Sequence, residues 1–139
     1  MSNIDPKFKA AVTAAIARKD ADELEAALNL DSGHEADRTQ LYEDLLLETW
    51  HRSHEDIIRY LQKHPTPSSI DVLRAAITLK PRLKYLDYDD YGSYYKKCLW
   101  ALAVNPNPTA IEVIREFSTH HDKSLQKEAQ YRLAKIDQR

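Results

Sequence analysis

Apolar residues recur three and four positions apart along most of this chain, with polar residues between them. Phe8, Val12 and Ile16 form one such stripe, and the run from Leu41 to Leu46 carries another. This spacing is the period of an amphipathic helix. Alternating stretches rich in Val, Ile and Thr, as strands require, are missing from the sequence. The pattern predicts an all-α fold.

Cap residues divide this pattern into separate helices. Asp5 and Asp20 precede the first two stripes, and Ser53 and Asp122 precede two later ones. Such side chains accept hydrogen bonds from the unpaired N–H groups of a first helical turn. We expect a third helix to run from about 38 to 51, and Ser53 to cap the helix that follows it.

A repeat of 41 residues is the most specific feature of the sequence. The segment HPTPSSIDVLRAAI (64–77) aligns with NPNPTAIEVIREFS (105–118). We expect the first proline of each segment to end one helix, and Thr66 or Asn107 to cap the next. This two-helix unit resembles HEAT-like repeats, which implies a short α-solenoid of about seven or eight helices in one domain over 1–139. The alternative is an irregular helical bundle with one duplicated hairpin.

Cysteine usage and the longest apolar run bear on where the protein works. Cys98 is the only cysteine, so neither an intrachain disulfide nor a thiolate cage for a metal can form. It lies on an apolar stripe, and we expect it in the core. The run AAVTAAIA (10–17) is too short and too mildly apolar to span a bilayer. We therefore expect a cytoplasmic protein with no membrane contact.

The net charge of −2 conceals an uneven distribution along the chain. Between Asp20 and Glu48, ten acidic residues stand against Arg38 alone, which gives minus nine and leaves plus seven for the remainder. This division argues against a nucleic-acid binder that uses its whole surface, while it leaves a local basic face open. It favours a basic protein as the partner.

The segment WHRSHED (50–56) is the strongest candidate for chemistry, because His51 and His54 are three residues apart and two acidic residues follow. Histidines at helical spacing can hold zinc or iron. Ser53 is expected to interrupt the helix between them, however, and no third ligand is evident. The competing interpretation is structural, with Ser53 as a cap and the acidic residues in the first helical turn. We favour the structural interpretation, and expect no catalytic residue, metal or cofactor.

The segment YLDYDDYGSYY (85–95) holds five of the eight tyrosines and three aspartates, without a lysine or arginine. Amphipathic rings next to carboxylates are typical of a protein-binding edge. Alternatively, Tyr85, Leu86 and Tyr88 fold back over the helices while the aspartates only solvate the loop. Trp100 lies off the apolar stripe of its helix, which leaves both core packing and partner contact open for it.

Four motifs in this order, WHRSHEDIIRYLQ, IDVLRAAI, LDYDD and KKCLWALA, resemble a group of small HEAT-like bacterial immunity proteins. The resemblance implies a cytosolic protein that is not an enzyme and that binds the toxic domain of a cognate polymorphic or contact-dependent toxin. The chain is less acidic than nuclease inhibitors of this kind, which leaves the toxin's activity open. The alternative is a HEAT-like scaffold or regulatory subunit that binds a cellular protein.

On the immunity hypothesis, we expect the acidic segment and the tyrosine-rich loop to cover a basic toxin surface. The predicted partner-binding residues are Glu43, Asp44, Glu48, His51, His54, Glu55, Tyr85, Asp87, Tyr88, Asp89, Asp90, Tyr91 and Tyr94.

Overall fold

Helices account for the regular structure in the computed structural model, which describes residues 5–30, 38–87 and 92–137. Eight α-helices and two short 3₁₀ helices lie in these ranges, and no strand does. The prediction of an all-α fold is confirmed. The α-helices are α1 (Pro6–Arg18), α2 (Ala21–Leu28), α3 (Thr39–Leu46), α4 (His54–Lys63), α5 (Ser68–Leu79), α6 (Ser93–Ala103), α7 (Pro108–Phe117) and α8 (Lys123–Asp137), and the 3₁₀ helices are η1 (Lys80–Arg82) and η2 (Lys84–Leu86).

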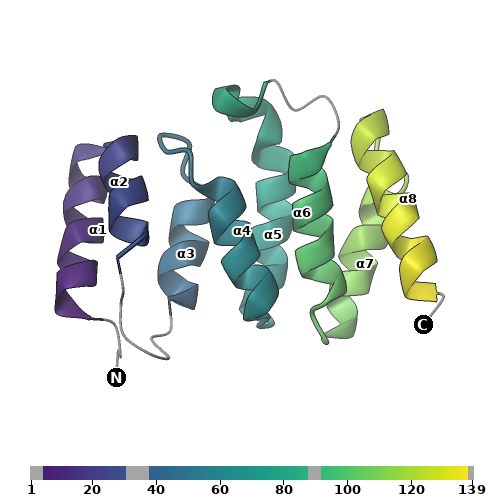
Figure 1. Cartoon of the computed structure of the whole chain (residues 1–139). Coiled ribbons are helices and arrows are strands. Elements are labelled where there is room, and N and C mark those ends of the chain that lie inside the picture. The colour runs from purple at the N-terminus through teal and green to yellow at the C-terminus, as the bar shows by residue number, and fades with distance from the viewer. Residues whose placement is uncertain (1–4, 31–37, 88–91, 138–139) are drawn as a thin grey trace.

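The helices stack as antiparallel hairpins in one row from α1 to α8 (Figure 1). Helices α4, α6 and α8 pack on one another in order, and α3, α5 and α7 do the same in a second layer. The pairs α4–α5 and α6–α7 correspond to the two copies of the 41-residue repeat, so equivalent helices lie in the same layer. This arrangement is a short α-solenoid, as predicted.

The apolar stripes of the helices meet between these layers and form one core. Phe8 of α1, Leu24 of α2 and Ile57 of α4 are fully buried in it. Burial of a side chain of this size stabilises the fold by about 1.5–3 kcal/mol. Cys98 of α6 is also buried, in agreement with its expected place in the core.

Most of the predicted caps are present. A side-chain oxygen accepts a hydrogen bond from a first-turn N–H at 2.7 Å for Asp5, and at 3.0 Å for Asp20, Asp122 and Asn107. The prediction for Thr66 is wrong, because its Oγ1 lies 2.9 and 3.1 Å from the hydroxyls of the next two serines and makes no cap bond to α5.

The third helix is shorter than predicted, since α3 ends at Leu46 instead of continuing to His51. A longer helix would need the Leu45 carbonyl as the acceptor for a main-chain N–H one turn later. This carbonyl instead accepts from the His51 ring at 2.7 Å and from the Glu48 N–H at 3.1 Å. Residues 47–53 therefore form a loop between α3 and α4.

The connections after α1, α3, α5 and α7 all lie at the same end of the stack, uppermost in Figure 1. We call their described residues, 19–20, 47–53, 80–87 and 118–122, the loop edge. Within it, η1 and η2 fold the chain back so that Leu83 and Leu86 are buried. Across the described ranges, every helix is too short or too polar to traverse a lipid bilayer.

Candidate functional site

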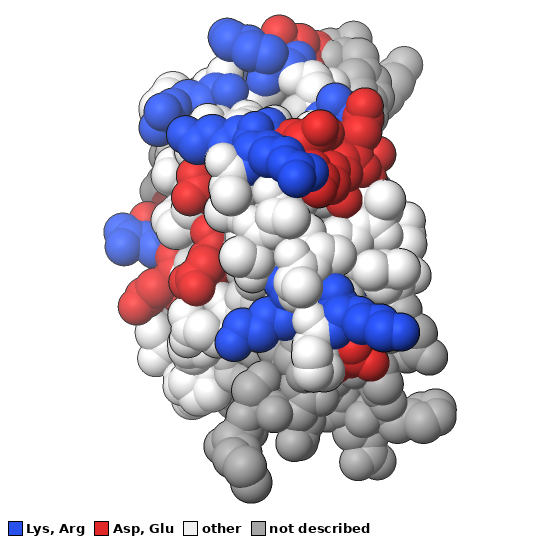
Figure 2. Space-filling view, turned by 90° about the vertical axis from the view of Figure 1, so that its left-hand side faces the viewer, with Lys and Arg blue, Asp and Glu red and all other residues white. Residues whose placement is uncertain are grey.

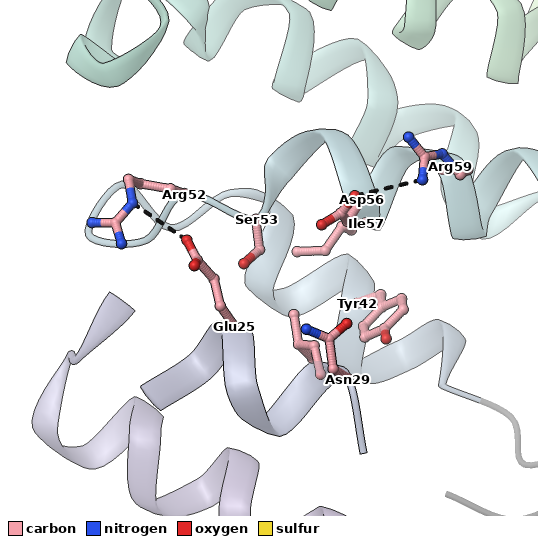
Figure 3. Close-up of a pocket in the computed structure, with 9 residues that line it drawn as sticks. Glu25, Asn29, Tyr42, Arg52, Ser53, Asp56, Ile57 and Arg59 are labelled. Carbon is pink, nitrogen blue, oxygen red and sulfur yellow. Dashed lines mark ion pairs between the residues drawn. The ribbon is translucent and has the colours of Figure 1, made fainter. Parts of the chain in front are cut away.

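A groove of about 490 Å³ lies between α2 and the start of α4 (Figure 3). Its size is typical of sites that enclose a small ligand or a protruding side chain. We call it the α2–α4 groove. The residues that line it are Glu25, Leu28, Asn29, Tyr42, Arg52, Ser53, Asp56, Ile57 and Arg59.

Helical periodicity directs these side chains to the groove. On α2, Leu24 points into the core, so that Glu25 and Asn29, one turn apart, stand on the groove side. On α4, Ile57 is buried at the base of the groove while Asp56 stands beside it at the rim. The close-up shows the α2 and α4 side chains approaching from opposite sides (Figure 3).

Two arginines lie at the rim, each with a carboxylate. Arg52 of the loop edge forms ion pairs with Asp22 and, at 3.3 Å, with Glu25. The hydrogen bond with Asp22 and the charge of Glu25 raise the pKa of Arg52, which therefore stays charged. Arg59 reaches Asp56 only at 3.7 Å. The side chains of Glu25 and Asp56 remain 43% and 75% exposed, so both carboxylates are loosely neutralised and reachable from solvent.

The hydroxyl of Ser53 is an exception to the rule that buried polar groups are paired. Ser53 is 2% exposed, and its Oγ has no hydrogen-bond partner among the described residues. The prediction that it caps α4 is wrong in this respect, since Ser53 stands at the cap position but its side chain makes no cap bond. Leaving such a group unpaired costs about 1–3 kcal/mol. The cost falls on a residue that lines the groove.

His51 and His54 form a buried stack behind the groove, with ring centroids 4.1 Å apart. The His51 Nε2 donates to the Leu45 carbonyl at 2.7 Å, and its Nδ1 accepts from the Ser53 N–H at 3.0 Å. The His54 Nε2 donates to the Glu48 carbonyl at 2.6 Å. Its Nδ1 accepts from the Tyr85 hydroxyl at 2.7 Å. Both rings are therefore neutral, and all four nitrogens are engaged.

Burial accounts for the protonation state of this pair. Desolvation lowers the pKa of His51, and for His54 desolvation together with the neighbouring His51 lowers the pKa to about 4. No group of three or more His, Cys, Asp or Glu side chains in the described ranges is placed to hold a metal ion. The geometry fits the structural interpretation, in which the rings fix the loop between α3 and α4.

Four of the predicted partner-binding residues are buried and their polar atoms bond within the protein, so the structure does not present them as contact residues. His51 and His54 form the stack described above. Glu43 accepts hydrogen bonds from the hydroxyls of two serines of α5, at 2.7 and 3.0 Å. Tyr94 is fully buried and donates to the Ala76 carbonyl at 2.8 Å.

Other predicted residues keep some exposure. Asp44, Glu48 and Asp87 are exposed. Glu55 is half-buried and forms an ion pair with Lys97 at 2.5 Å. Tyr85 is half-buried with its hydroxyl on His54, so for Tyr85 and the buried Leu86 the alternative holds in which the segment folds back over the helices. Tyr88, Asp89, Asp90 and Tyr91 lie outside the described residues.

The acidic segment is less uniform on the folded surface than in the sequence. Asp22, Glu23 and Glu25 of α2 pair with Arg18 or Arg52, which come from other parts of the chain. Seen from the α1 side, red and blue side chains lie against one another near the upper end (Figure 2). Among the described residues, the acidic segment therefore does not form a single acidic face.

Trp100 of α6 lies at the surface, and 42% of the residue is exposed. The Arg132 guanidinium of α8 lies 4.1 Å from its ring centroid and 5.4 Å from that of Tyr131, which is 51% exposed. The Lys135 ammonium lies 5.5 Å from the Tyr131 ring centroid. We call these four residues the aromatic–cation surface.

Most of the groove residues carry no signal in the sequence. Leu28 and Asn29, Tyr42, and the 52–59 segment are brought together only by the packing of α2, α3 and α4. The fold and the groove together describe an all-α stack of helical hairpins with a polar groove toward one end. Comparison of the chain with protein-family models, curated proteins and solved structures gives no match.

Proposed function

We propose that this protein is an immunity protein that binds and neutralises a cognate bacterial toxin domain as a stoichiometric inhibitor. The observation that carries the proposal is the α2–α4 groove, a preformed concavity with two loosely neutralised carboxylates and an unpaired buried hydroxyl. The resemblance of the WHRSHED region to small HEAT-like immunity proteins points to the toxin as the partner, and this region forms one wall of the groove.

A stack of packed helices suits this role because little of the binding free energy is lost in ordering the interface. The surface of the protein measures 8332 Å², of which a standard interface, roughly 800 Å² per partner, would take about a tenth. The surface of the groove alone covers less than this area. The neighbouring part of the loop edge, including the exposed Glu48, supplies the remaining area in the proposed complex.

Charged residues at the groove indicate what kind of partner surface the proposed complex involves. Glu25 and Asp56 at the rim, together with the exposed Asp20 and Glu48 of the loop edge, favour a basic partner surface. Complementary charge raises the association rate and fixes orientation.

The test is neutralisation of the protein encoded directly upstream of this chain. Co-expression in a bacterial host is expected to restore growth, and light scattering is expected to show a 1:1 complex. Reversing two groove charges with Glu25→Lys and Asp56→Lys should weaken the complex at least about tenfold, because each lost attraction becomes a repulsion. Failure to restore growth and to form a complex would contradict the proposal.

A matched control exists on α7. Glu112 and Glu116 are 68% and 46% exposed and pair with Arg115 and Arg74, so they resemble Asp56 and Glu25 in exposure and in pairing. The double change Glu112→Lys and Glu116→Lys alters the net charge equally, away from the groove. It should leave binding within about twofold, apart from the screened long-range contribution.

The second candidate is a HEAT-like scaffold or regulatory subunit that binds a cellular protein. The aromatic–cation surface favours it, because exposed Trp and Tyr next to cations are typical of binding hot spots. It lies on α6 and α8, toward the opposite end of the row from α2 (Figure 1). Replacement of Trp100 by alanine would abolish partner binding by a scaffold of this kind while leaving toxin neutralisation through the groove intact.

A further inference from the structure

We infer that the α2–α4 groove is a receptor for one arginine side chain, whose stem lies on Leu28 and Ile57 while its guanidinium reaches Glu25, Asp56 and the Ser53 hydroxyl. The inference rests on the proposed function for the source of this arginine, a basic partner protein. The groove chemistry itself is independent of which protein supplies it.

The lining matches a long side chain with an apolar stem and a polar end. Leu28 and Ile57 provide apolar contact at the base, where Ile57 is fully buried. Three methylene groups of an arginine can pack there while the charged end stays at the wet rim. A purely apolar side chain would place no donor on the polar atoms of the lining.

Acceptors stand on both walls of the groove, together with the guanidinium groups of Arg52 and Arg59. Glu25 projects from α2 and Asp56 from α4, and Ser53 and Asn29 lie between them (Figure 3). The planar guanidinium carries five N–H donors in a fixed fork, so it can reach carboxylates on both walls at once. A lysine ammonium is a point charge with three donors, and it satisfies fewer of these acceptors.

An anion fits the same groove poorly. Arg52 is already held by Asp22 and Glu25, and an anion would have to displace these carboxylates. A guanidinium can join Glu25 without breaking this pair, because a carboxylate accepts several hydrogen bonds. Arg59 is the other cation of the lining, and it faces Asp56. The acceptor sites that these ion pairs leave open therefore favour a guest that donates hydrogen bonds over one that accepts them.

The Ser53 hydroxyl is the observation that distinguishes this groove from an ordinary acidic patch. It is buried, it lines the groove, and it lacks a partner among the described residues. A bound N–H donor would supply the missing hydrogen bond to its oxygen. A smaller cleft beside Arg74 and Glu116, of about 230 Å³, has no such group among its lining residues.

The experiment is a titration of ¹⁵N-labelled protein followed by main-chain amide chemical shifts. The probe is N-acetyl-arginine N-methylamide, and the comparison probes are its neutral isostere from citrulline, the lysine derivative, and inorganic phosphate. The arginine probe should give saturable shifts at Asn29, Ser53 and Asp56 with a dissociation constant on the order of millimolar. The lysine probe should bind several-fold more weakly, and citrulline and phosphate should give no saturable shift.

Two double variants complete the test. Glu25→Gln with Asp56→Asn should weaken the arginine probe at least about tenfold, because both charge-assisted hydrogen bonds are lost. Glu112→Gln with Glu116→Gln should not change it. Saturable binding of phosphate, equal binding of lysine and arginine, or no saturable shift with arginine would each overturn the inference. Arginine binding without toxin neutralisation would refute the proposed function alone.

Discussion

The ring of His54 is buried and neutral, and burial in the folded state lowers its pKa. Its pKa in the folded state is about 4, chiefly because burial disfavours the charged ring, whereas an unfolded histidine has a pKa of 6.5. The unfolded state therefore binds more protons between these values. The contribution of His54 to stability is complete above pH 6.5 and is lost as the pH falls toward 4.

We predict that the free energy of unfolding decreases by about 1.5 kcal/mol between pH 6.5 and pH 5 through His54 alone. Urea unfolding at both pH values measures the change. His54→Gln keeps a donor for the Glu48 carbonyl and does not titrate, so its stability should vary less over this interval. An equally steep decrease in the variant would show that another group is responsible.

Ser53 and Ser69 are both buried serines, and they should respond in opposite ways to the loss of a hydroxyl. Ser53 Oγ has no partner among the described residues, whereas Ser69 Oγ donates to Glu43 at 3.0 Å. Ser53→Ala should raise the free energy of unfolding by about 1 kcal/mol, and Ser69→Ala should lower it by about the same amount. Thermal unfolding of both variants tests this, and a loss of stability in Ser53→Ala would mean that its hydroxyl is paired in solution.

The same change carries a functional cost in our interpretation. Ser53→Ala should also weaken binding of the arginine probe, because one acceptor of the groove is removed. Functional sites often contain polar atoms that lower the stability of the fold but contribute to binding, and Ser53 fits this description in our interpretation.

Among the elements, α8 depends on a cap that also ties it to α6. The carboxylate of Asp122 accepts from the N–H groups of Ser124 and Leu125 at 3.0 and 3.3 Å, and from the Tyr95 hydroxyl at 2.9 Å. Asp122→Ala should lower the free energy of unfolding by about 1–2 kcal/mol. Hydrogen exchange should show α8 losing protection before the central helices.

The matched control for this prediction is Asp137→Ala, which removes an exposed carboxylate at the other end of α8. An acidic residue there interacts unfavourably with the helix dipole. Its removal should leave the stability of α8 unchanged or slightly raised. Equal loss of protection in the two variants would mean that the cap of Asp122 contributes nothing specific.

Helix positions were predictable wherever the local sequence decides them. The 41-residue repeat located α4 to α7, and the aspartate caps located the starts of α1, α2 and α8. The end of α3 was not predictable, because it depends on a ring from the next turn of chain taking the carbonyl of Leu45. Such a bond between side chain and main chain leaves no trace in hydrophobic periodicity.

For the molecule as a whole, charge counted along the chain was a poor guide to charge on the surface. Arg18 precedes the acidic segment in the sequence and Arg52 follows it. In the folded chain both form ion pairs with carboxylates of α2. The candidate groove escaped prediction for the same reason, since its lining comes from three helices and a loop. The tyrosine-rich segment supplied two core rings, Tyr94 and Tyr95, whose burial follows from the apolar stripe of α6.

The most direct test of the role proposed for the groove is hydrogen exchange of this protein alone and in complex with the protein encoded directly upstream of it. We expect added protection in residues 21–30 and 52–60, on the two walls of the α2–α4 groove, and little change in α6 and α8. Protection confined to the aromatic–cation surface of α6 and α8, with the groove walls unchanged, would contradict the assignment of the groove as the partner-binding site.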